Sequence, residues 1–147
     1  MTRPGISNPT LLIEFPIEFL VHGTPVSWQS KTSRSKDEWK EMVRSASSAV
    51  LPEHHFASDG RIAVTLYYLP DEPMQGDIDN VCKLVLDALS RHVFMDDRQV
   101  ERLVIQKFEP GIVLPFSAPS DTLLDALTGV VPVLYVRISD DPFEDLR

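Results

Sequence analysis

Apolar residues recur at helical spacing in the second half of the chain, at Val81, Leu84, Val85, Ala88 and Leu89. Steps of three and four residues place these side chains on one face of a helix. The pattern therefore predicts a helix over about residues 80–91 that packs by this face. Its start is marked by Asp79 or Asn80, because both residue types are good N-caps.

A second apolar stripe predicts an earlier helix that ends near Val50. Ser35 and Glu38 have the spacing of a capping box at its start. The stripe itself consists of Trp39, Met42, Val43 and Ala46. A third and shorter helix is expected over residues 122–127, with Gly129 as its stop.

Four segments have the composition or the alternation of β-strands. The second is rich in β-branched and aromatic residues and is followed by Pro70. The third alternates, so Leu103 and Ile105 are expected on one face and Phe108 on the other. Pro16 interrupts the first segment, which favours an edge position or a bulge. In chain order, the segments are residues 10–22, 61–69, 100–108 and 131–138.

These elements follow one another as strand, helix, strand, helix, strand, short helix and strand. Their order predicts an α/β or α+β fold, with a mixed sheet of about four strands and two main helices on one face. The chain has 147 residues, of which 43% are hydrophobic, and this suits one domain with a real core. We therefore expect a single domain over residues 1–147.

Composition narrows the cellular context. No apolar run approaches the roughly 20 residues that a membrane-spanning helix needs. The first residues, Met1 to Gly5, lack the pattern of a signal peptide, so a cytoplasmic location is expected. Cys82 is the single cysteine, which excludes an internal disulfide and fits a reducing compartment. Beside Val81 on the predicted helix, it is expected to be a packing residue rather than a nucleophile.

Carboxylates gather around the predicted helix over residues 80–91. If the chain before this helix is extended, Asp77 and Asp79 leave it on the same side and can share an ion. Asp96 and Asp97 come in the turn before the next strand and can close the site from a second element. Oxygen ligands of this kind suit Mg²⁺ or Mn²⁺. We therefore predict metal-assisted phosphodiester chemistry.

Each of these residues also has a simpler interpretation. Asp79 can be simply an N-cap of the helix, a role that needs no metal. Lys83 and Asp87 follow Asp79 at intervals of four residues, so they can form a solvated ion pair on the helix. The Asp96 and Asp97 pair can be a polar turn. The spacing of the whole set favours a shared site, because independent caps and turns rarely reproduce it.

As a set, these residues resemble the RusA-type family of Holliday junction resolvases. The family pattern is Asp-x-Asp-Asn, then a lysine four residues after the second Asp, an Asp four residues later, and Asp-Asp-x-x-Val beyond. The matching residues are Asp77, Asp79, Asn80, Lys83, Asp87, Asp96, Asp97 and Val100. The close resemblance covers about residues 64–107, and a looser one extends over the N-terminal half. Residues 110–130 are atypical of the family.

The resemblance implies a small homodimeric endonuclease that cuts four-way DNA junctions symmetrically with Mg²⁺, for which Mn²⁺ is a possible substitute. It implies no small-molecule cofactor and no membrane partner. The catalytic set carried over from the family is Asp77, Asp79, Lys83 and Asp97, and its three carboxylates are the metal ligands. Supporting or structural roles are expected for Asn80, Asp87 and Asp96.

The overall charge is opposite to that of most DNA-binding proteins. The net charge is −8 and the pI is near 4.9. Part of the excess lies in the segment from Asp140 to Asp145, which is expected to be a solvated end. Residues 31–44 carry a positive balance, and the first part of this stretch is predicted to be a loop that follows DNA phosphates. The proposed DNA-binding residues are Lys31, Arg34, Lys36 and Trp28.

The acidic balance favours one alternative, a catalytically weak or inactive RusA-like DNA-binding or phage-associated accessory protein. Two other enzyme classes fit less well. Sugar-nucleotide transferases with an Asp-x-Asp metal motif need a larger nucleotide-binding core than 147 residues offer. Aspartyl-phosphate phosphatases carry Asp-x-Asp directly after an early strand, with Thr or Val following. Asn80 and the late position of the motif argue against that class.

Overall fold

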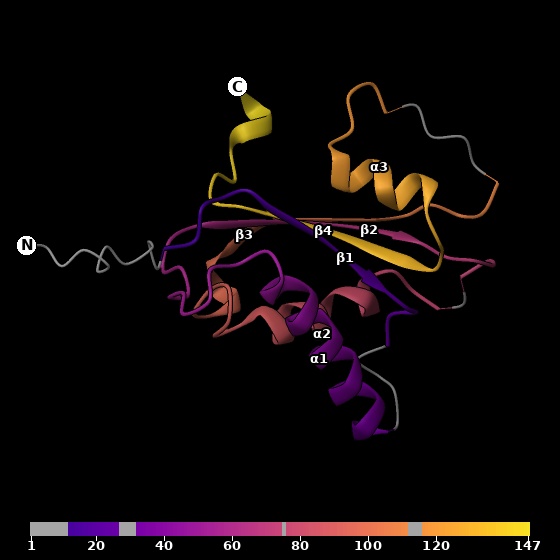
Figure 1. Ribbon diagram of the computed structural model, residues 1–147, viewed down its shortest axis with the longest axis horizontal. Coiled ribbons are helices and arrows are strands. Elements are labelled where there is room, and N and C mark those ends of the chain that lie inside the picture. The colour runs from indigo at the N-terminus through magenta and orange to yellow at the C-terminus, as the bar shows by residue number, and fades with distance from the viewer. Residues whose placement is uncertain (1–11, 27–31, 75, 112–115) are drawn as a thin grey trace, which may run out of the picture.

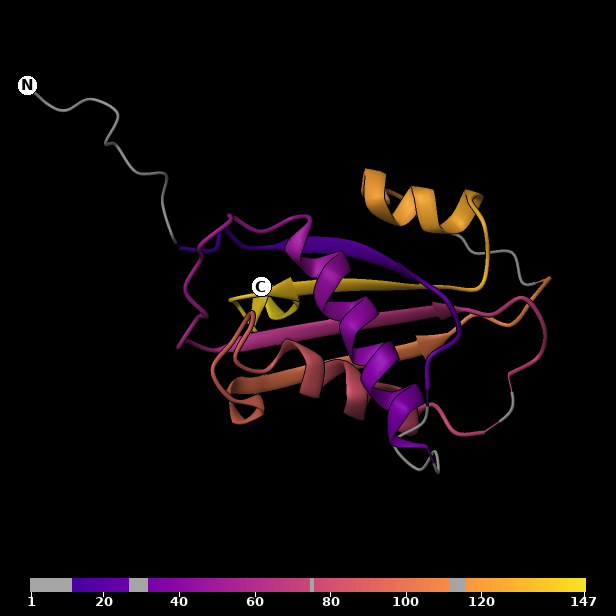
Figure 2. The ribbon, with the colours of Figure 1, turned by 60° about the horizontal axis from the view of Figure 1, so that its bottom comes forward.

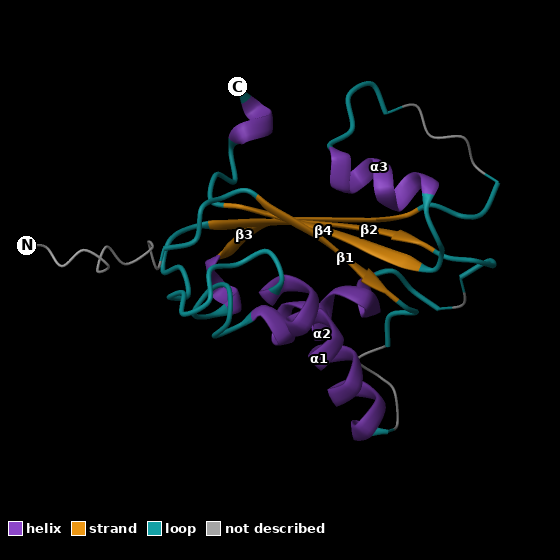
Figure 3. Cartoon of the chain, in the orientation of Figure 1, coloured by secondary structure: helices purple, strands orange, loops and turns teal. Residues whose placement is uncertain are grey.

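The computed structural model describes residues 12–26, 32–74, 76–111 and 116–147. A four-stranded mixed sheet forms its centre, with the strands in the order β1-β4-β2-β3 (Figure 3). β4 runs antiparallel to both β1 and β2, whereas β2 and β3 are parallel. The strands are β1 (Ile17–His22), β2 (Ile62–Leu69), β3 (Val100–Lys107) and β4 (Val133–Ser139).

Helices cover both faces of this sheet. α1 (Ser33–Ser48) and α2 (Asp79–Leu89) lie on one face, and α3 (Asp121–Thr128) lies on the opposite face (Figure 1). α1 crosses the sheet obliquely, and α2 lies beside it over β2 and β3 (Figure 2). The structure thus confirms the predicted small α+β domain with two main helices on one face of a four-stranded sheet.

Alternation along the strands decides which side chains each helix covers. On β2, Val64 and Leu66 are fully buried in the core that includes α1 and α2. Tyr67 lies between them in sequence and therefore faces the other side, where it joins the smaller cluster under α3. Leu103 and Ile105 of β3 pair with Val64 and Leu66, which confirms the face predicted for them.

The helical stripe predicted from the sequence is buried as a whole. Its five residues are Val81, Leu84, Val85, Ala88 and Leu89. They share one core with Trp39 and Val43 of α1 and with Phe94, which follows α2. Burying one such large apolar side chain contributes about 1.5–3 kcal/mol, so this interface fixes how α2 is rotated against the sheet.

The start of α1 differs from the prediction. The N-cap is Thr32, whose side chain makes no capping hydrogen bond with the backbone, and Ser33 is the first helical residue. Ser35 and Glu38 therefore lie inside the helix, and the predicted capping box is wrong. Pro16 directly precedes β1, so the predicted first strand begins later than expected, at an edge of the sheet. In the part of the chain described here, no helix is long and apolar enough to cross a membrane.

α3 forms within residues 110–130. The Oγ atom of Ser120 accepts a hydrogen bond of 3.1 Å from the Leu123 N–H, and Gly129 follows the last helical residue. The predicted short helix and its stop are therefore confirmed. Leu123 packs with aromatic residues of the sheet face below, so α3 covers one half of that face. The aromatic residues are Tyr67, Phe108, Phe116 and Tyr135.

Phe94→Ala should lower the free energy of unfolding by about 3–5 kcal/mol, because the fully buried ring would leave a cavity in the core. Urea denaturation followed by circular dichroism measures the change. Phe56→Ala is the matched control, since this ring is 62% exposed and should change stability by at most about 0.5 kcal/mol. Equal losses in the two variants would contradict the core assignment.

Candidate functional site

The connection from β2 to α2 forms one end of the molecule. It is tied to the end of β3, because the Met74 N–H donates a hydrogen bond of 3.2 Å to Glu109 Oε2. A cavity of about 200 Å³ lies beside this connection, between Thr24, Tyr68 and Val81 at the start of α2. Burial raises the pKa of Tyr68, so its hydroxyl stays protonated near neutral pH.

Asp77 and Asp79 lie at this end, and both are exposed. Ile78 between them has helical backbone angles, and the Asn80 N–H donates a hydrogen bond of 3.2 Å to the Asp77 carbonyl oxygen. The chain is thus a tight turn here and not the extended segment that the sequence suggested. Asp79 is the first helical residue and does not cap α2. Among the described residues, neither carboxylate takes part in a hydrogen bond or an ion pair.

The next residues of the motif follow along α2. Lys83 Nζ lies 3.4 Å from the Asp87 carboxylate, and both side chains are partly exposed. Asn80 is partly buried in the first turn. The Cys82 thiol donates to the Asp79 carbonyl oxygen at 3.0 Å, and burial raises its pKa. Cys82 packs against the main core, so it has the packing position expected from the sequence.

Asp96 and Asp97 come after the other end of α2, in a turn with its own hydrogen bonds. Asp96 caps a short 3₁₀ helix, Asp97–Gln99, by accepting a hydrogen bond of 2.9 Å from the Arg98 N–H. This bond lowers the pKa of Asp96, so its carboxylate is charged near neutral pH. Asp97, the first residue of the 3₁₀ helix, is exposed.

Gln99 is a supporting residue that the sequence reasoning missed. Its amide nitrogen donates hydrogen bonds of 2.8 Å to the carbonyl oxygens of Ser58 and Gly60. Its amide oxygen accepts a hydrogen bond of 2.8 Å from the Asp96 N–H. One side chain therefore holds the Asp96 turn against the chain before β2. Only the capping-box spacing of Asp96 and Gln99 could have indicated part of this role.

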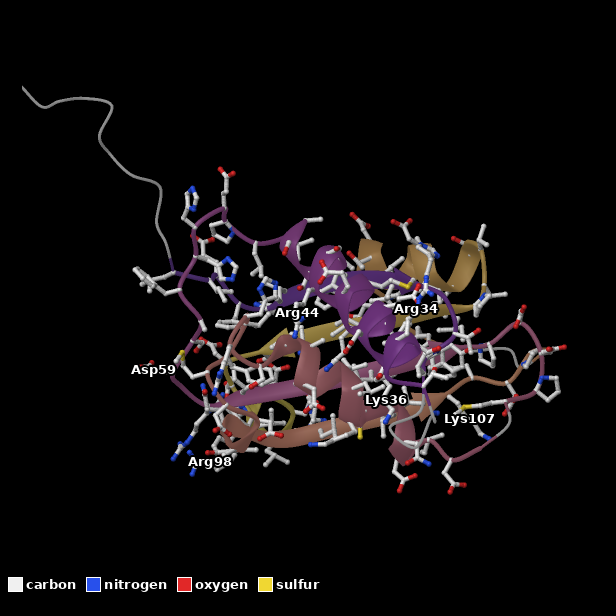
Figure 4. All side chains as sticks on the ribbon, turned by 90° about the horizontal axis from the view of Figure 1, so that it is seen from below. Arg34, Lys36, Arg44, Asp59, Arg98 and Lys107 are labelled. Carbon is white, nitrogen blue, oxygen red and sulfur yellow. The ribbon has the colours of Figure 1, made fainter. Side chains whose placement is uncertain are left out.

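The two carboxylate groups lie at opposite ends of α2. Its 11 residues rise by about 15 Å from Asp79 to Leu89. In Figure 4, Arg98, which follows Asp97 in sequence, lies at one end of the molecule, and Lys107 at the end of β3 lies at the other. Within the described residues, no three His, Cys, Asp or Glu side chains are close enough to hold one metal ion. A single chain does not bring Asp97 to Asp77 and Asp79, unlike the arrangement expected from the sequence.

The basic residues proposed for DNA binding are on α1 or lie outside the described residues. Arg34 and Lys36 belong to the first turns of α1 and not to a loop (Figure 4). Arg34 Nε lies 3.5 Å from the Glu38 carboxylate, and both side chains are largely exposed. Lys31 and Trp28 lie outside the residues that the structure describes.

Comparison with known proteins adds one match. A family model described as endodeoxyribonuclease RusA matches residues 21–113, which is more than half of the chain. The matched region runs from the end of β1 to just beyond β3 and includes both carboxylate groups and Lys83. No individual curated protein matches the chain.

Gln99→Ala should lower the free energy of unfolding by about 1–3 kcal/mol, because two carbonyl oxygens and one N–H lose their partner. Thermal or urea unfolding measures the loss. Gln106→Ala on the following strand, β3, is the matched control, since Gln106 is exposed. If the two variants were equally stable, Gln99 would not be the residue that holds the Asp96 turn.

Proposed function

Because the chain belongs to the RusA endodeoxyribonuclease family, we propose that it resolves four-way DNA junctions by Mg²⁺-dependent hydrolysis of paired phosphodiester bonds. The family assignment supports a junction-resolving nuclease. The dependence on Mg²⁺, with Mn²⁺ as a possible substitute, and the turnover of this chain are part of the proposal. A DNA substrate in turn implies a cytoplasmic site of action.

The observation that carries the proposal is the pair Asp77 and Asp79. Both carboxylates are exposed at the start of α2, and among the described residues no side chain forms a hydrogen bond or an ion pair with them. Two such oxygen donors suit Mg²⁺, which commonly takes one or two protein carboxylates and keeps several waters. Asp79 makes no capping hydrogen bond, and its place in the first turn of α2 favours a charged carboxylate that stays open to solvent. The donor set therefore fits the metal, although it is small in one chain.

A second copy of the chain would complete this site. The length of α2 keeps Asp97 away from Asp77 and Asp79 of its own chain. In a two-fold symmetric dimer, Asp97 of each copy can approach Asp77 and Asp79 of the other. This arrangement yields two equal sites, as paired cuts in opposing strands require. The homodimer is thus proposed as the catalytic unit and not only as a means of holding DNA.

Within such a site, this chain's residues have distinct roles. Asp77, Asp79 and Asp97 would hold the ion, and a bound Mg²⁺ supplies a water of lowered pKa and positive charge at the leaving oxygen. Lys83 lies one turn beyond Asp79 and would stabilise negative charge that develops on the phosphate. Asp87 lies 3.4 Å from the Lys83 ammonium group and would orient it. Asn80 would stabilise the turn at the start of α2, and Asp96 would stabilise the turn that carries Asp97.

DNA contacts beyond the cut site are proposed for the start of α1. Arg34 is exposed on the first turn, and Lys36 follows it. Lys31 and Trp28 precede the helix in sequence and are kept as DNA-binding residues of the proposal. Ion pairs with phosphates would position the junction without reading its sequence.

A second candidate function rests on charge. A net charge of −8 opposes binding to a polyanion, which favours a RusA-like accessory protein that binds DNA or a protein partner without turnover. Cleavage of a labelled four-way junction, with and without Mg²⁺, separates the two candidates. Paired Mg²⁺-dependent incisions support the nuclease, and binding without incision supports the accessory protein.

Asp79→Asn and Asp97→Asn should each reduce junction cleavage more than about 100-fold, because loss of a direct metal ligand exceeds the loss of an outer partner. Gel analysis of a labelled junction measures the rate, and circular dichroism checks that the fold is retained. Asp125→Asn, an exposed change on α3, should leave the rate unchanged. Full activity in either site variant would contradict the assignment of that residue as a metal ligand.

Mixing the two inactive variants should restore one active site per mixed dimer. In a mixed dimer, one site combines both substitutions, and the other has wild-type Asp77, Asp79 and Asp97. The mixture should therefore nick junctions in one strand, whereas each variant alone stays inactive. Light scattering should give about twice the chain mass of 16.6 kDa. No rescue in a mixture that forms mixed dimers would show that each site belongs to one chain.

A further inference from the structure

One half of the sheet face under α3 is polar and is covered by the end of the chain. Arg102 of β3 and Arg137 of β4 lie on this half, on the strand positions that pair with Ala63 and Thr65 of β2. Residues 140–147 turn back over it, and their 3₁₀ turn, Glu144–Leu146, stands on the same side of the sheet as α3 (Figure 1). This segment is therefore not the solvated end expected from the sequence.

Three arginines from different parts of the sheet contact this segment. Arg137 Nη1 donates a short hydrogen bond to Glu144, which also accepts one of 2.8 Å from Ser139. Arg102 Nη2 lies 2.7 Å from the Asp145 carboxylate. Arg61, which also pairs with Glu101 at 3.2 Å, lies 5.8 Å from the centre of the Phe143 ring. These three arginines form what we call the arginine surface.

Charge holds the segment more than apolar packing does. Leu146 is 80% exposed and Phe143 is 43% exposed, so neither side chain anchors the segment in a core. Pro142 is the buried residue of the turn. The Arg102–Asp145 pair is partly exposed, so it is weak and is weakened further by salt, whereas the side chains of Arg137 and Glu144 are both mostly buried. A phosphate that forms the same charge-assisted bonds with the two arginines can take the place of these carboxylates.

A cavity of about 540 Å³ continues from this contact toward α3. Its wall includes Arg102, Arg137 and the rings of Tyr67 and Phe116. The Glu18 carboxylate in the same wall accepts hydrogen bonds from Tyr135 and Ser120. The volume lies in the usual range of ligand sites, and aromatic rings beside guanidinium groups are a common setting for nucleotides.

We propose that the arginine surface binds the phosphodiester backbone of DNA, and that Glu144 and Asp145 occupy it when DNA is absent. Guanidinium groups bind carboxylates and phosphates with the same forked geometry, so one can replace the other. The proposal rests on the proposed function, because a DNA nuclease of net charge −8 needs a place where phosphates are attracted. The segment then acts as an intrachain mimic of the DNA backbone.

The position of the surface fits this role. Arg102 on β3 follows Asp97 by five residues, so even a fully extended chain would separate the two by no more than about 17 Å. Arg61 precedes β2 at the same end of the sheet. DNA on the arginine surface would therefore pass near the end of the molecule that contributes Asp97 to the proposed site.

The test compares two double variants of equal net charge in the full chain. Glu144→Gln with Asp145→Asn removes both carboxylates that pair with the sheet. Asp125→Asn with Asp140→Asn removes two exposed carboxylates that make no such pair. Binding of a labelled four-way junction is measured by fluorescence anisotropy in EDTA over a series of salt concentrations, so that catalysis does not contribute.

We expect the first variant to bind about fivefold more tightly than the second, because DNA no longer competes with two ion pairs. Its slope of log affinity against log salt should be steeper, because in the second variant added salt also weakens the competing ion pairs and so offsets part of the loss of affinity. Adding Arg102→Gln and Arg137→Gln should abolish both gains. Equal affinity and equal slope in the two double variants would overturn the proposal.

Two further readouts keep the outcomes distinct. In the wild type, DNA should speed hydrogen exchange at the Leu146 N–H, which is bonded to the Phe143 carbonyl oxygen, and unchanged exchange would count against displacement. This measurement needs no arginine variant to fold. If the wild type cuts junctions but the double variants bind alike, the inference fails and the nuclease stands. If no variant binds DNA in a salt-dependent way, both fail.

Discussion

The packing of α2 against the sheet is the constraint on which the rest of the structure depends. Its apolar stripe is buried with the core residues of β2 and α1, so the rotation and position of the helix are fixed. Asp79 therefore lies at the start of α2, at one end of the sheet. Asp97 follows the end of α2 and lies toward the opposite end of the sheet. The same burial that stabilises the fold thus separates the carboxylates that the motif places close together in sequence.

Local pairing of charges matters more here than the net charge. Arg137 and Arg102 are each matched by a carboxylate of the last turn, and Lys83 is matched by Asp87 on its own helix. The net charge of the chain does not reveal these cations, because a paired cation and carboxylate together add zero to it. A protein with an acidic balance can therefore keep groups of arginines that become available when a carboxylate is displaced.

Much of the fold could be predicted from the sequence, because side-chain burial follows the period of each element. The stripe of α2 and the alternation of β3 are examples, and the cap of α3 at Ser120 is another. Helix starts were harder to predict, since α2 begins after Ile78, a residue with no capping side chain.

Long-range relations could not be predicted in the same way. The bond from Gln99 to Ser58 joins residues 41 positions apart, and no local pattern reveals it. The contact between Arg137 and Glu144 depends on a turn that brings the chain back over the sheet, and no local pattern in the sequence indicates which face the turn covers. The separation of Asp79 from Asp97 could not be predicted from the motif, because the motif specifies only the number of residues between them. The helix within that interval extends by about 1.5 Å per residue and so moves its two ends apart.

The length of α2 along its axis therefore contributes directly to the spacing of the two proposed sites. In the proposed dimer, one site contains Asp79 of the first copy and the other contains Asp97 of the same copy, so the rise of α2 and the turn that follows it would together set the spacing of the two sites. A rise of about 15 Å corresponds to roughly four or five steps of stacked bases at about 3.4 Å each. One added helical turn would lengthen this span by about 5.4 Å, or between one and two base steps. In such a dimer, the spacing of the two sites would depend on the length of a helix and not on any contact with a base.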